Sequence, residues 1–241
     1  MYAISLTSIP PRYARLGPVL ESLLAQRPAP GRVLLCLPQQ PMRFAPAPWP
    51  EVPDGVEVLS LEEDMGPASK VLSAARLLAG LGGRLIYCDD DWIMPQGWAA
   101  RLLAGDESEA VAGSGFDLRR LKRKSHAAPR AEYADIAQGF AGVAVRPDWL
   151  AGVECTPPPA AWPVNPPPAA WPVDDIWLSA QLARQGIAVR LAPEARAGMR
   201  PAYTDAHGLQ DAVIDGRDRA AANRACLDEI TARYGLWPPL D

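Results

Sequence analysis

The chain of 241 residues has 49% apolar and 22% charged residues, a globular composition that excludes the disordered and fibrous classes. Its net charge of -4 argues against general nucleic-acid binding, because proteins of that kind usually carry a basic face that neutralises phosphates. No apolar run approaches the roughly 20 residues needed to span a bilayer, and no basic region followed by an apolar one opens the chain. We therefore expect a cytoplasmic protein with one domain over residues 1–241 and no transmembrane segment.

The beginning of the chain alternates strand and helix patterns. Residues 3–7 and 32–37 are short apolar runs that predict buried strands. Between them, apolar side chains recur at helical spacing at Leu16, Val19, Leu20, Leu23 and Leu24. A strand, a helix and a strand in this order predict a parallel sheet with right-handed crossovers. A proline-rich loop over residues 38–54 and a short strand over residues 56–59 are expected to follow.

Residues 62–70, with the sequence EEDMGPASK, lead into a second predicted helix. A Gly-Pro turn at a helix start exposes backbone N–H groups, and such a terminus attracts phosphate. Lys70 stands in the first turn beside it. The sequence therefore makes Lys70 a candidate phosphate contact, with an ordinary surface lysine as the alternative.

A buried strand over residues 85–88 ends directly in Asp89, Asp90 and Asp91. In open α/β sheets the ligand crevice lies beyond the carboxyl ends of the strands, so these acids stand where a site is expected. Three neighbouring carboxylates repel one another unless a cation or hydrogen-bond donors neutralise them. Aspartates two apart on an extended chain point the same way, so Asp89 and Asp91 can share Mg²⁺ or Mn²⁺. A solvated acidic turn is the alternative.

The second half of the chain continues the alternation of elements. Helices are expected over residues 98–103 and 220–234, and strands over residues 110–113, 140–147 and 187–191. Gly139 and Gly142 beside the second of these strands leave room for close approach by another group.

The segment 119–124 packs five cations into six residues. Such a segment is most simply a solvated loop, and contact with an anionic acceptor or a peripheral membrane surface is the alternative.

A proline-rich loop over residues 156–173 contains the octapeptide PPPAAWPV twice, at residues 157–164 and 166–173. Two copies are too few for a solenoid, so we interpret them as a duplicated segment of a surface loop. Trp162 and Trp171 either pin this loop to the body of the protein or offer faces on which a sugar stacks.

Two further acids and one histidine complete the set of candidate site residues. Asp174 and Asp175 open a predicted helix directly after the repeat. Asp174 is a good N-cap, but capping does not explain the second acid. His207 lies in a polar segment flanked by glycine, where a lone histidine is more often structural or solvated than a ligand.

Four pieces of the chain together resemble the GT-A class of nucleotide-sugar glycosyltransferases, particularly the family-two-like enzymes. They are the first strand with the following residues 8–12 (SIPPR), the helix start at residues 66–70, the acidic strand end at residues 89–91, and the acid pair Asp174-Asp175. The resemblance implies a single Rossmann-like α/β domain with a mostly parallel central sheet flanked by helices. It also implies metal-dependent transfer of a sugar from a nucleotide-diphosphate donor to a hydroxyl acceptor, such as a glycan.

The resemblance also implies roles for individual residues. Asp91 is the implied direct ligand of Mn²⁺ or Mg²⁺, Asp89 contacts the ribose or the metal, and His207 is the counterpart of a C-terminal histidine that completes the metal shell. Asp175 corresponds to the base that takes the acceptor proton. A carboxylate at a helix N-terminus is stabilised as the anion, so we expect Asp175 to be a weak base that mainly orients the hydroxyl. The nucleotide donor is expected to contact Ser8, Arg12, Asp64, Lys70, Asp89 and Asp90.

Two other functions remain open on the same architecture. A sugar nucleotidyltransferase is one of them, but it would require a Gly-rich phosphate loop after the first strand, which the sequence lacks. A non-catalytic glycan-binding domain is the other, since fold does not fix function. Acids at both residues 89–91 and residues 174–175 argue against a decayed site.

Overall fold

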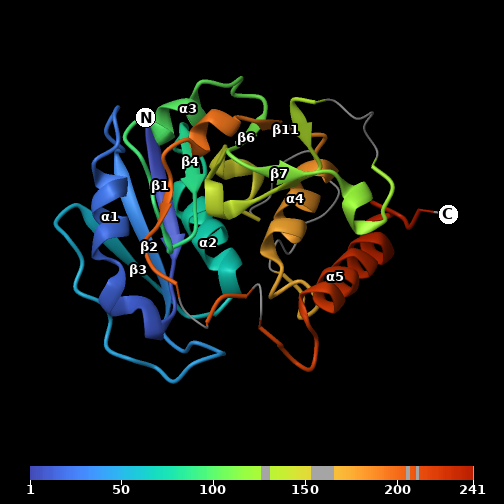
Figure 1. The fold of residues 1–241 in the computed structure, drawn as a ribbon, viewed down its shortest axis with the longest axis horizontal. Helices are drawn as coiled ribbons and strands as arrows, with labels where there is room; N and C mark the ends of the chain where they lie inside the picture. The colour runs from blue at the N-terminus through green and yellow to red at the C-terminus, as the bar shows by residue number, and fades with distance from the viewer. Residues whose placement is uncertain (126–130, 153–165, 205–206, 210–211, 241) are drawn as a thin grey trace.

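The computed structural model describes residues 1–125, 131–152, 166–204, 207–209 and 212–240. A central sheet of eight strands in the order β3-β2-β1-β4-β10-β6-β11-β8 runs through the molecule (Figure 1). Its strands are β1 (Tyr2–Thr7), β2 (Arg32–Pro38), β3 (Val56–Leu61), β4 (Arg84–Tyr87), β6 (Ala110–Ala112), β8 (Tyr133–Ala134), β10 (Val143–Val145) and β11 (Val189–Leu191).

The sheet is mostly parallel, as the sequence predicts. β1 pairs in parallel with β2 and β4, β2 with β3, and β6 with β11. β10 runs antiparallel to both of its neighbours, and β8 runs antiparallel to β11. β4 is buried along its whole length and β1 at all but its last residue, which explains why their sequences are mostly continuous apolar runs rather than alternating ones.

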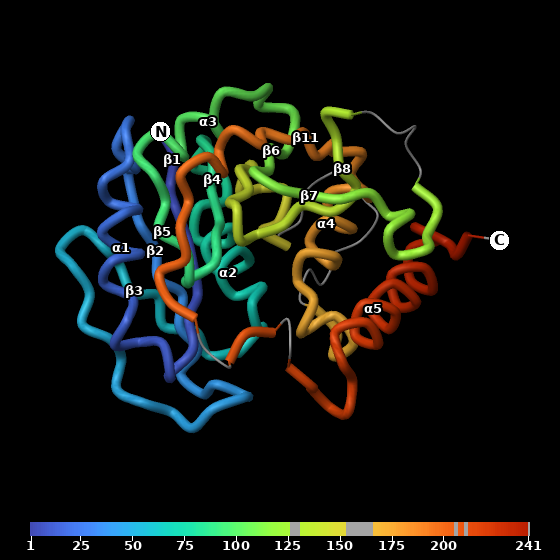
Figure 2. Tube along the Cα trace, viewed as in Figure 1, coloured from blue at the N-terminus to red at the C-terminus, as the bar shows by residue number. Residues whose placement is uncertain are grey.

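Helices cover both faces of the sheet, and each contributes an apolar stripe to a core. On one face, α1 (Gly17–Leu24) and α3 (Trp98–Leu103) pack on the strands through Leu20 and Trp98. On the other face, α2 (Ser69–Leu78) and α4 (Asp174–Arg184) pack through Leu72 and Leu178. α5 (Arg219–Tyr234) lies against α4 at the far side from α1, as Figure 2 shows. The helices predicted from apolar spacing are therefore confirmed.

Short elements complete the fold and shape the rim of the sheet. Two small sheets pair β5 (Trp92–Ile93) with β12 (Arg200–Pro201), and β7 (Gly115–Phe116) with β9 (Ile136–Ala137). The 3-10 helices are η1 (Pro10–Arg15), η2 (Gly66–Ala68), η3 (Leu118–Leu121), η4 (Gly139–Ala141), η5 (Pro147–Trp149) and η6 (Pro193–Arg196).

The strand order places the ligand crevice between β1 and β4. From β1 the chain proceeds outward to β2 and β3 on one side, and then returns to β4 on the other side of β1. Such a reversal opens a crevice at the carboxyl ends of the two central strands. The segment after β1 begins with Ser8, and the segment after β4 contains the three adjacent aspartates. The fold therefore brings these two segments together.

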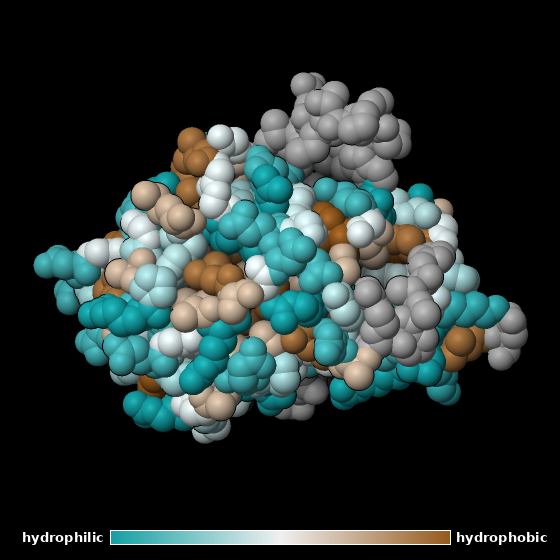
Figure 3. All heavy atoms as spheres, turned by 90° about the horizontal axis from the view of Figure 1, so that it is seen from above, coloured by the Kyte–Doolittle hydropathy of each residue, from teal (hydrophilic) through white to brown (hydrophobic). Residues whose placement is uncertain are grey.

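The surface of the protein carries both apolar and hydrophilic side chains. Among the described residues on the face in Figure 3, apolar side chains lie in small groups between hydrophilic ones. None of the helices in the described part of the chain is apolar over a length that would cross a membrane. In the basic segment, Arg119 pairs with Asp117, Arg123 pairs with Asp228, and Arg120 lies over the ring of Phe116. Intramolecular partners therefore account for part of its charge.

The second copy of the proline-rich octapeptide packs against the body of the protein. The indole Nε1 of Trp171 donates a hydrogen bond to the backbone oxygen of Asp64 at 3.1 Å. Gly66 lies under the indole, and a Cβ on Gly66 would stand 2.7 Å from the ring. Trp171 thus pins its loop, as one of the two predicted roles requires. The first copy, with Trp162, lies outside the described residues.

Deletion of residues 157–165 is expected to leave the fold intact. The two octapeptides are identical in sequence, and the second one supplies the contacts between Trp171 and Asp64. We expect the deletion variant to unfold in one cooperative transition at a melting temperature close to that of the wild type. Loss of cooperative unfolding in a calorimetric scan would contradict this expectation.

Candidate active site

A cavity of about 520 Å³ opens at the carboxyl ends of β1 and β4 and extends to the start of α4. Every residue that the sequence analysis proposed for the site lines it: Ser8, Arg12, Asp64, Lys70, Asp89, Asp90, Asp91, Asp175 and His207. The structure therefore brings together residues that are separated by up to two hundred positions in the chain, while their individual roles remain predictions.

Asp90 ties the segment after β4 to the segment after β1. Its side chain is buried, and it accepts hydrogen bonds from Ser8 Oγ at 2.5 Å and from Arg12 Nη1 at 2.6 Å. The hydroxyl of Tyr203 donates a hydrogen bond to the backbone oxygen of Asp90. Burial raises the pKa of Asp90, and the Arg12 guanidinium opposes that rise. Asp90 therefore has a structural role, because it joins the two segments at the crevice through its hydrogen bonds with Ser8 and Arg12.

Asp91 has an oxygen that lacks a partner. Its Oδ1 is buried and makes no hydrogen bond within the described part of the protein, and its Oδ2 lies 3.7 Å from Arg12 Nη1. Burial, followed by repulsion from Asp89 and Asp90, raises the pKa of Asp91 to about 6. A buried carboxylate oxygen without a donor is costly, and it is the kind of atom that a hard cation would satisfy.

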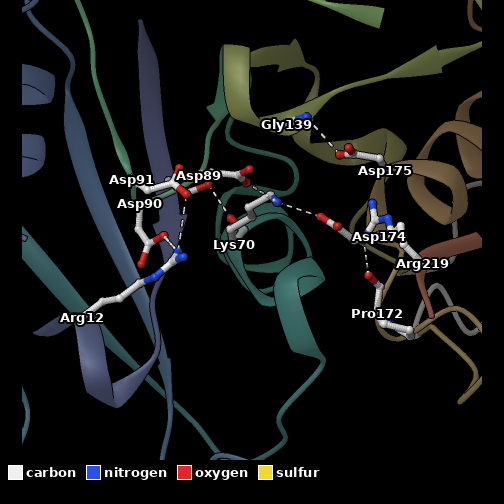
Figure 4. Close-up of polar contacts among 11 residues, drawn as sticks. Arg12, Lys70, Asp89, Asp90, Asp91, Gly139, Pro172, Asp174, Asp175 and Arg219 are labelled. Atoms are coloured by element: carbon white, nitrogen blue, oxygen red, sulfur yellow. Dashed lines mark hydrogen bonds and ion pairs between the residues drawn. The ribbon is translucent and has the colours of Figure 1, made fainter. Parts of the chain in front are cut away.

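Lys70 is a buried bridge between the two acidic ends of the site (Figure 4). Its Nζ lies 2.7 Å from Asp89 Oδ1 and 2.7 Å from Asp174 Oδ2. Burial alone would lower the pKa of Lys70, but Asp174 and Asp89 outweigh it and raise that pKa well above its usual value. Gly139 makes room for this bridge, because a Cβ there would stand 3.1 Å from Nζ. Lys70 is thus not a surface lysine, and its ammonium group already has two anionic partners.

The start of α2 differs from the open phosphate site that the sequence suggests. The N–H group of Gly66 donates to Asp64 Oδ1 at 2.7 Å, and that of Met65 donates to Ser69 Oγ at 3.2 Å. Asp64 Oδ2 accepts from the N–H group of Met42. Both carboxylate oxygens of Asp64 therefore bind backbone groups and join two loops at the mouth of the cavity, so a donor contact by Asp64 remains a prediction.

Asp174 and Asp175 occupy the first turn of α4, and two expectations about them are wrong. The N-cap is Val173, and the carboxylate of Asp174 pairs with Lys70 instead of capping the helix. Asp175 is half-buried, and its Oδ1 accepts a hydrogen bond from the N–H group of Gly139 at 2.9 Å. Burial, and then the charge of Asp174, raise the pKa of Asp175 to about 7. The helix N-terminus does not make Asp175 a weak base, because burial and a neighbouring acid outweigh it.

His207 lines the cavity beside the loop that follows β2. Its ring meets that of Phe44 edge-on at a centroid distance of 5.6 Å, and its backbone oxygen accepts from Arg43 Nη2 at 3.4 Å. Among the described residues, no three side chains of the His, Cys, Asp and Glu types converge on a common metal position. The ligand set Asp89, Asp91 and His207 is therefore not preassembled there and stays a prediction.

The charge of the cavity fits one divalent ion. Six aspartates and four cationic side chains line it, which leaves an excess of two negative charges when all the aspartates are ionised. The partnerless oxygen of Asp91 lies at the end of the cavity next to β4. Carboxylate oxygens are the ligands that Mg²⁺ and Mn²⁺ prefer, and an ion held by few protein groups keeps positions open for phosphate oxygens. The residues present therefore fit one divalent cation whose remaining coordination positions are open to a ligand.

Several residues of the cavity were missed by sequence reasoning. Arg43, Phe44, Gln138 and Arg219 line the cavity, but each lies in a loop or at a helix end without a motif. For the neighbourhood of Gln138 there was one signal, because Gly139 was expected to allow close approach and does so for Lys70. No comparable signal marks Arg43 or Arg219.

No protein-family model matches the chain, and no curated protein matches its sequence. Among solved structures, the chain is similar to GalNAc-T7 with UDP, GalNAc and Mn²⁺, at 14% identity and a TM-score of 0.51. That match covers 80% of this chain and only 42% of GalNAc-T7. A mycobacterial protein is similar at 14% identity and a TM-score of 0.51, with 98% of this chain and 75% of that chain covered. The chain therefore has the predicted fold, that of the GT-A nucleotide-sugar glycosyltransferases.

A buried lysine between two acids predicts a large effect on stability. Replacing Lys70 with methionine is expected to lower the free energy of unfolding by roughly 3–5 kcal/mol, because the change leaves the buried carboxylate of Asp174 without its cation. Urea unfolding followed by circular dichroism measures this difference. The control is Lys122→Met at an exposed lysine, which should change stability by less than about 0.5 kcal/mol.

A second variant tests the reason for that loss. Asp174→Asn in the Lys70→Met background should recover part of the lost stability, because it removes the uncompensated charge. Equal stability of Lys70→Met and Lys122→Met would show that the bridge contributes nothing.

Proposed function

We propose that this protein transfers a sugar from a nucleotide-diphosphate donor to a hydroxyl acceptor, in the presence of Mn²⁺ or Mg²⁺. One observation carries the proposal. A single cavity has, at one end, a carboxylate with a buried oxygen that lacks a hydrogen-bond partner and, at the other end, a carboxylate with a pKa of about 7. The first, Asp91, follows β4 at the crevice where α/β proteins bind nucleotides. The second, Asp175, begins α4 and is separated from the first by the Lys70 bridge (Figure 4).

Asp91 would hold the divalent ion, with Asp89 and His207 as the other proposed ligands. When bound, such an ion supplies positive charge to the diphosphate that leaves as the sugar is transferred. Ser8 and Arg12 support this end of the site, because they hold Asp90 and thereby fix the backbone that presents Asp91.

Asp175 is the proposed general base. A base is most effective when its pKa lies near the working pH, and the pKa of Asp175 lies at about 7. The Gly139 N–H group holds Oδ1, which leaves Oδ2 to take the proton of the acceptor hydroxyl. Lys70 keeps Asp174 paired, so the two neighbouring carboxylates have separate tasks.

The comparisons support this proposal at the level of fold. GalNAc-T7, which shares the fold, was solved with UDP, GalNAc and Mn²⁺. A nucleotide sugar, a divalent ion and a hydroxyl acceptor are therefore the ligands that we propose for this chain. At 14% identity, the sugar and the acceptor are left to experiment.

The proposal is tested by binding followed by turnover. Nucleoside diphosphates with different bases are added with Mn²⁺ or with chelator, and thermal unfolding is recorded. We expect at least one of them to raise the melting temperature with Mn²⁺, because a ligand that binds only the folded state stabilises it. The matching nucleotide sugars should then release nucleoside diphosphate when a glycan acceptor is present.

The two alternative functions give different results in the same experiment. A glycan-binding domain would be stabilised by glycans and would not turn over nucleotide sugars. A nucleotidyltransferase would consume a nucleoside triphosphate and a sugar phosphate instead. Absence of both nucleotide binding and nucleotide-sugar turnover would refute the proposed function.

A further inference from the structure

Arg43 is a cation of the cavity that has no anionic partner in the described part of the protein. It lies in the irregular chain after β2, is half-buried, and lines the cavity. Its guanidinium group lies 5.1 Å from the centroid of the Phe44 ring, and Nη2 donates to the backbone oxygen of His207 at 3.4 Å. Neither contact neutralises its charge. The other cations near this end are paired, since Arg12 binds Asp90 and Lys70 binds Asp89.

The electrostatic surroundings of Arg43 call for an anion. Burial, and then repulsion from Arg12, lower the pKa of Arg43, while Asp64 opposes that change. Asp64 forms no ion pair with Arg43, and its two carboxylate oxygens accept hydrogen bonds from the N–H groups of Gly66 and Met42. Two guanidinium groups thus face one cavity without a shared counter-charge. A ligand anion between them would relieve both the repulsion and the burial of the unpaired charge.

The position of Arg43 selects the donor end of the cavity. Arg43 follows β2 and Arg12 follows β1, two neighbouring strands on the side of the sheet away from the α4 end of the cavity. Asp175 and Asp174 stand at that opposite end, beyond the Lys70 bridge. An acceptor must reach Asp175, so the anion near Arg43 belongs to the donor. The anionic part of a nucleotide sugar is its diphosphate.

We propose that Arg43 binds the diphosphate of the donor directly and does so without the metal ion. This inference rests on the proposed function, because it assumes a nucleotide-diphosphate donor. Arginine suits the task, since its planar guanidinium group donates two parallel hydrogen bonds to phosphate oxygens and is always charged. The guanidinium carbon lies 5.1 Å from the centroid of the Phe44 ring, within the range of a cation–π contact, which favours this position of the group. The diphosphate then has two independent sources of positive charge, Arg43 and the ion held by Asp91.

The experiment separates these two sources of charge. Calorimetric titration measures the affinity of the nucleoside diphosphate that binds best, in Mn²⁺ and in chelator, for the wild type and for Arg43→Gln. We expect the wild type to keep measurable affinity in chelator, and Arg43→Gln to lose about tenfold or more of it, as for a charged contact to phosphate. Arg43→Lys should recover only part of the affinity, because lysine keeps the positive charge but cannot donate two parallel hydrogen bonds to phosphate oxygens.

Two further comparisons test which part of the nucleotide Arg43 binds and provide a control variant. The corresponding nucleoside, which has no phosphate, should bind Arg43→Gln and the wild type equally, and inorganic pyrophosphate should show the same loss as the nucleotide. Arg120→Gln is the matched control, because Arg120 lies 5.2 Å from the centroid of Phe116 but does not line the cavity. It should leave every affinity unchanged. Thermal unfolding verifies that each variant is folded.

The possible outcomes are distinct. Equal diphosphate affinity of folded Arg43→Gln and wild type in chelator would overturn the role of Arg43 and leave the proposed function standing. An equal loss for the nucleoside would also overturn it, because the contact would then not be to phosphate. Failure of the wild type to bind any nucleoside diphosphate, even with Mn²⁺, would overturn both proposals.

Discussion

Replacing Asp175 with asparagine is expected to lower kcat for sugar transfer by about a hundredfold or more, which is the usual loss when a general base is removed. The amide keeps the shape of the side chain and can still accept the hydrogen bond from the Gly139 N–H group. Binding of nucleoside diphosphate with Mn²⁺ should stay within about twofold of wild type, because Asp175 stands at the opposite end of the cavity from Asp91. Asp54→Asn, at an exposed aspartate outside the cavity, is the matched control.

The pH dependence of the reaction gives a second measurement of the same role. Because the pKa of Asp175 is raised to about 7, wild-type kcat should rise with pH through about 7 as the carboxylate loses its proton. The residual activity of Asp175→Asn should not show this rise. A fall in kcat of less than about tenfold, or an unchanged pH profile in the variant, would assign the base to another residue.

The sign of the stability effect follows from the same pKa. A carboxyl group whose pKa is raised on folding stabilises the folded state below its unfolded pKa, near 4, and loses that contribution as the pH rises through about 7. At pH 8 the ionised Asp175 is therefore unfavourable in the folded state. Asp175→Asn should be more stable than the wild type at pH 8, and this advantage should disappear toward pH 4. Urea unfolding at the two pH values measures the difference.

The sequence predicts the elements and the location of the site, because both depend on local patterns. Continuous apolar runs such as residues 85–88 identify buried strands, and carboxyl ends of parallel strands share one edge of a sheet. Asp89, Asp90 and Asp91 could therefore be placed at the crevice without knowledge of their contacts. Ser8 and Arg12 became candidates only through the resemblance to the GT-A enzymes, as contacts of the donor, and the structure shows both side chains bound to Asp90.

The contacts themselves were not predictable, because they join distant parts of the chain. Lys70 and Asp174 are 104 positions apart, and nothing in either segment indicates the other. The sequence therefore made Asp174 an N-cap and Lys70 a phosphate contact. The pKa of Asp175 was predicted with the wrong sign for the same reason, since the helix terminus is a local effect and burial is a tertiary one. Arg43 lies in an irregular loop, where no periodicity marks a functional residue.

Replacing Asp91 with asparagine is expected to abolish most of the coupling between metal and nucleotide. In the wild type, Mn²⁺ and nucleoside diphosphate should each bind more tightly in the presence of the other, because each supplies ligands or charge that the other needs. An amide oxygen carries no charge and is a poorer ligand, so the variant should bind the nucleotide with nearly the same affinity in Mn²⁺ and in chelator. Calorimetric titration of the wild type and the variant under both conditions measures the coupling.

The same variant should be more stable than the wild type when no ligand is bound. The pKa of Asp91 is raised to about 6 by burial and by its two acidic neighbours, so its ionised form is unfavourable in the folded protein above that pH. Asparagine removes this repulsion, and each 1 kcal/mol of relief raises the melting temperature of a chain of this size by about 2–4 °C. The effect should be largest at pH 8 and absent near pH 4.

Asp89 provides the control within the same acidic triplet. Asp89→Asn removes a carboxylate that Lys70 binds at 2.7 Å, so it should lower the melting temperature, whereas Asp91→Asn should raise it. Opposite signs for two aspartates that stand two residues apart would be expected only if one is paired and the other awaits a cation. A purely solvated acidic turn predicts small and similar changes for both variants. Equal nucleotide affinity in Mn²⁺ and in chelator for the wild type would eliminate a metal-bridged site.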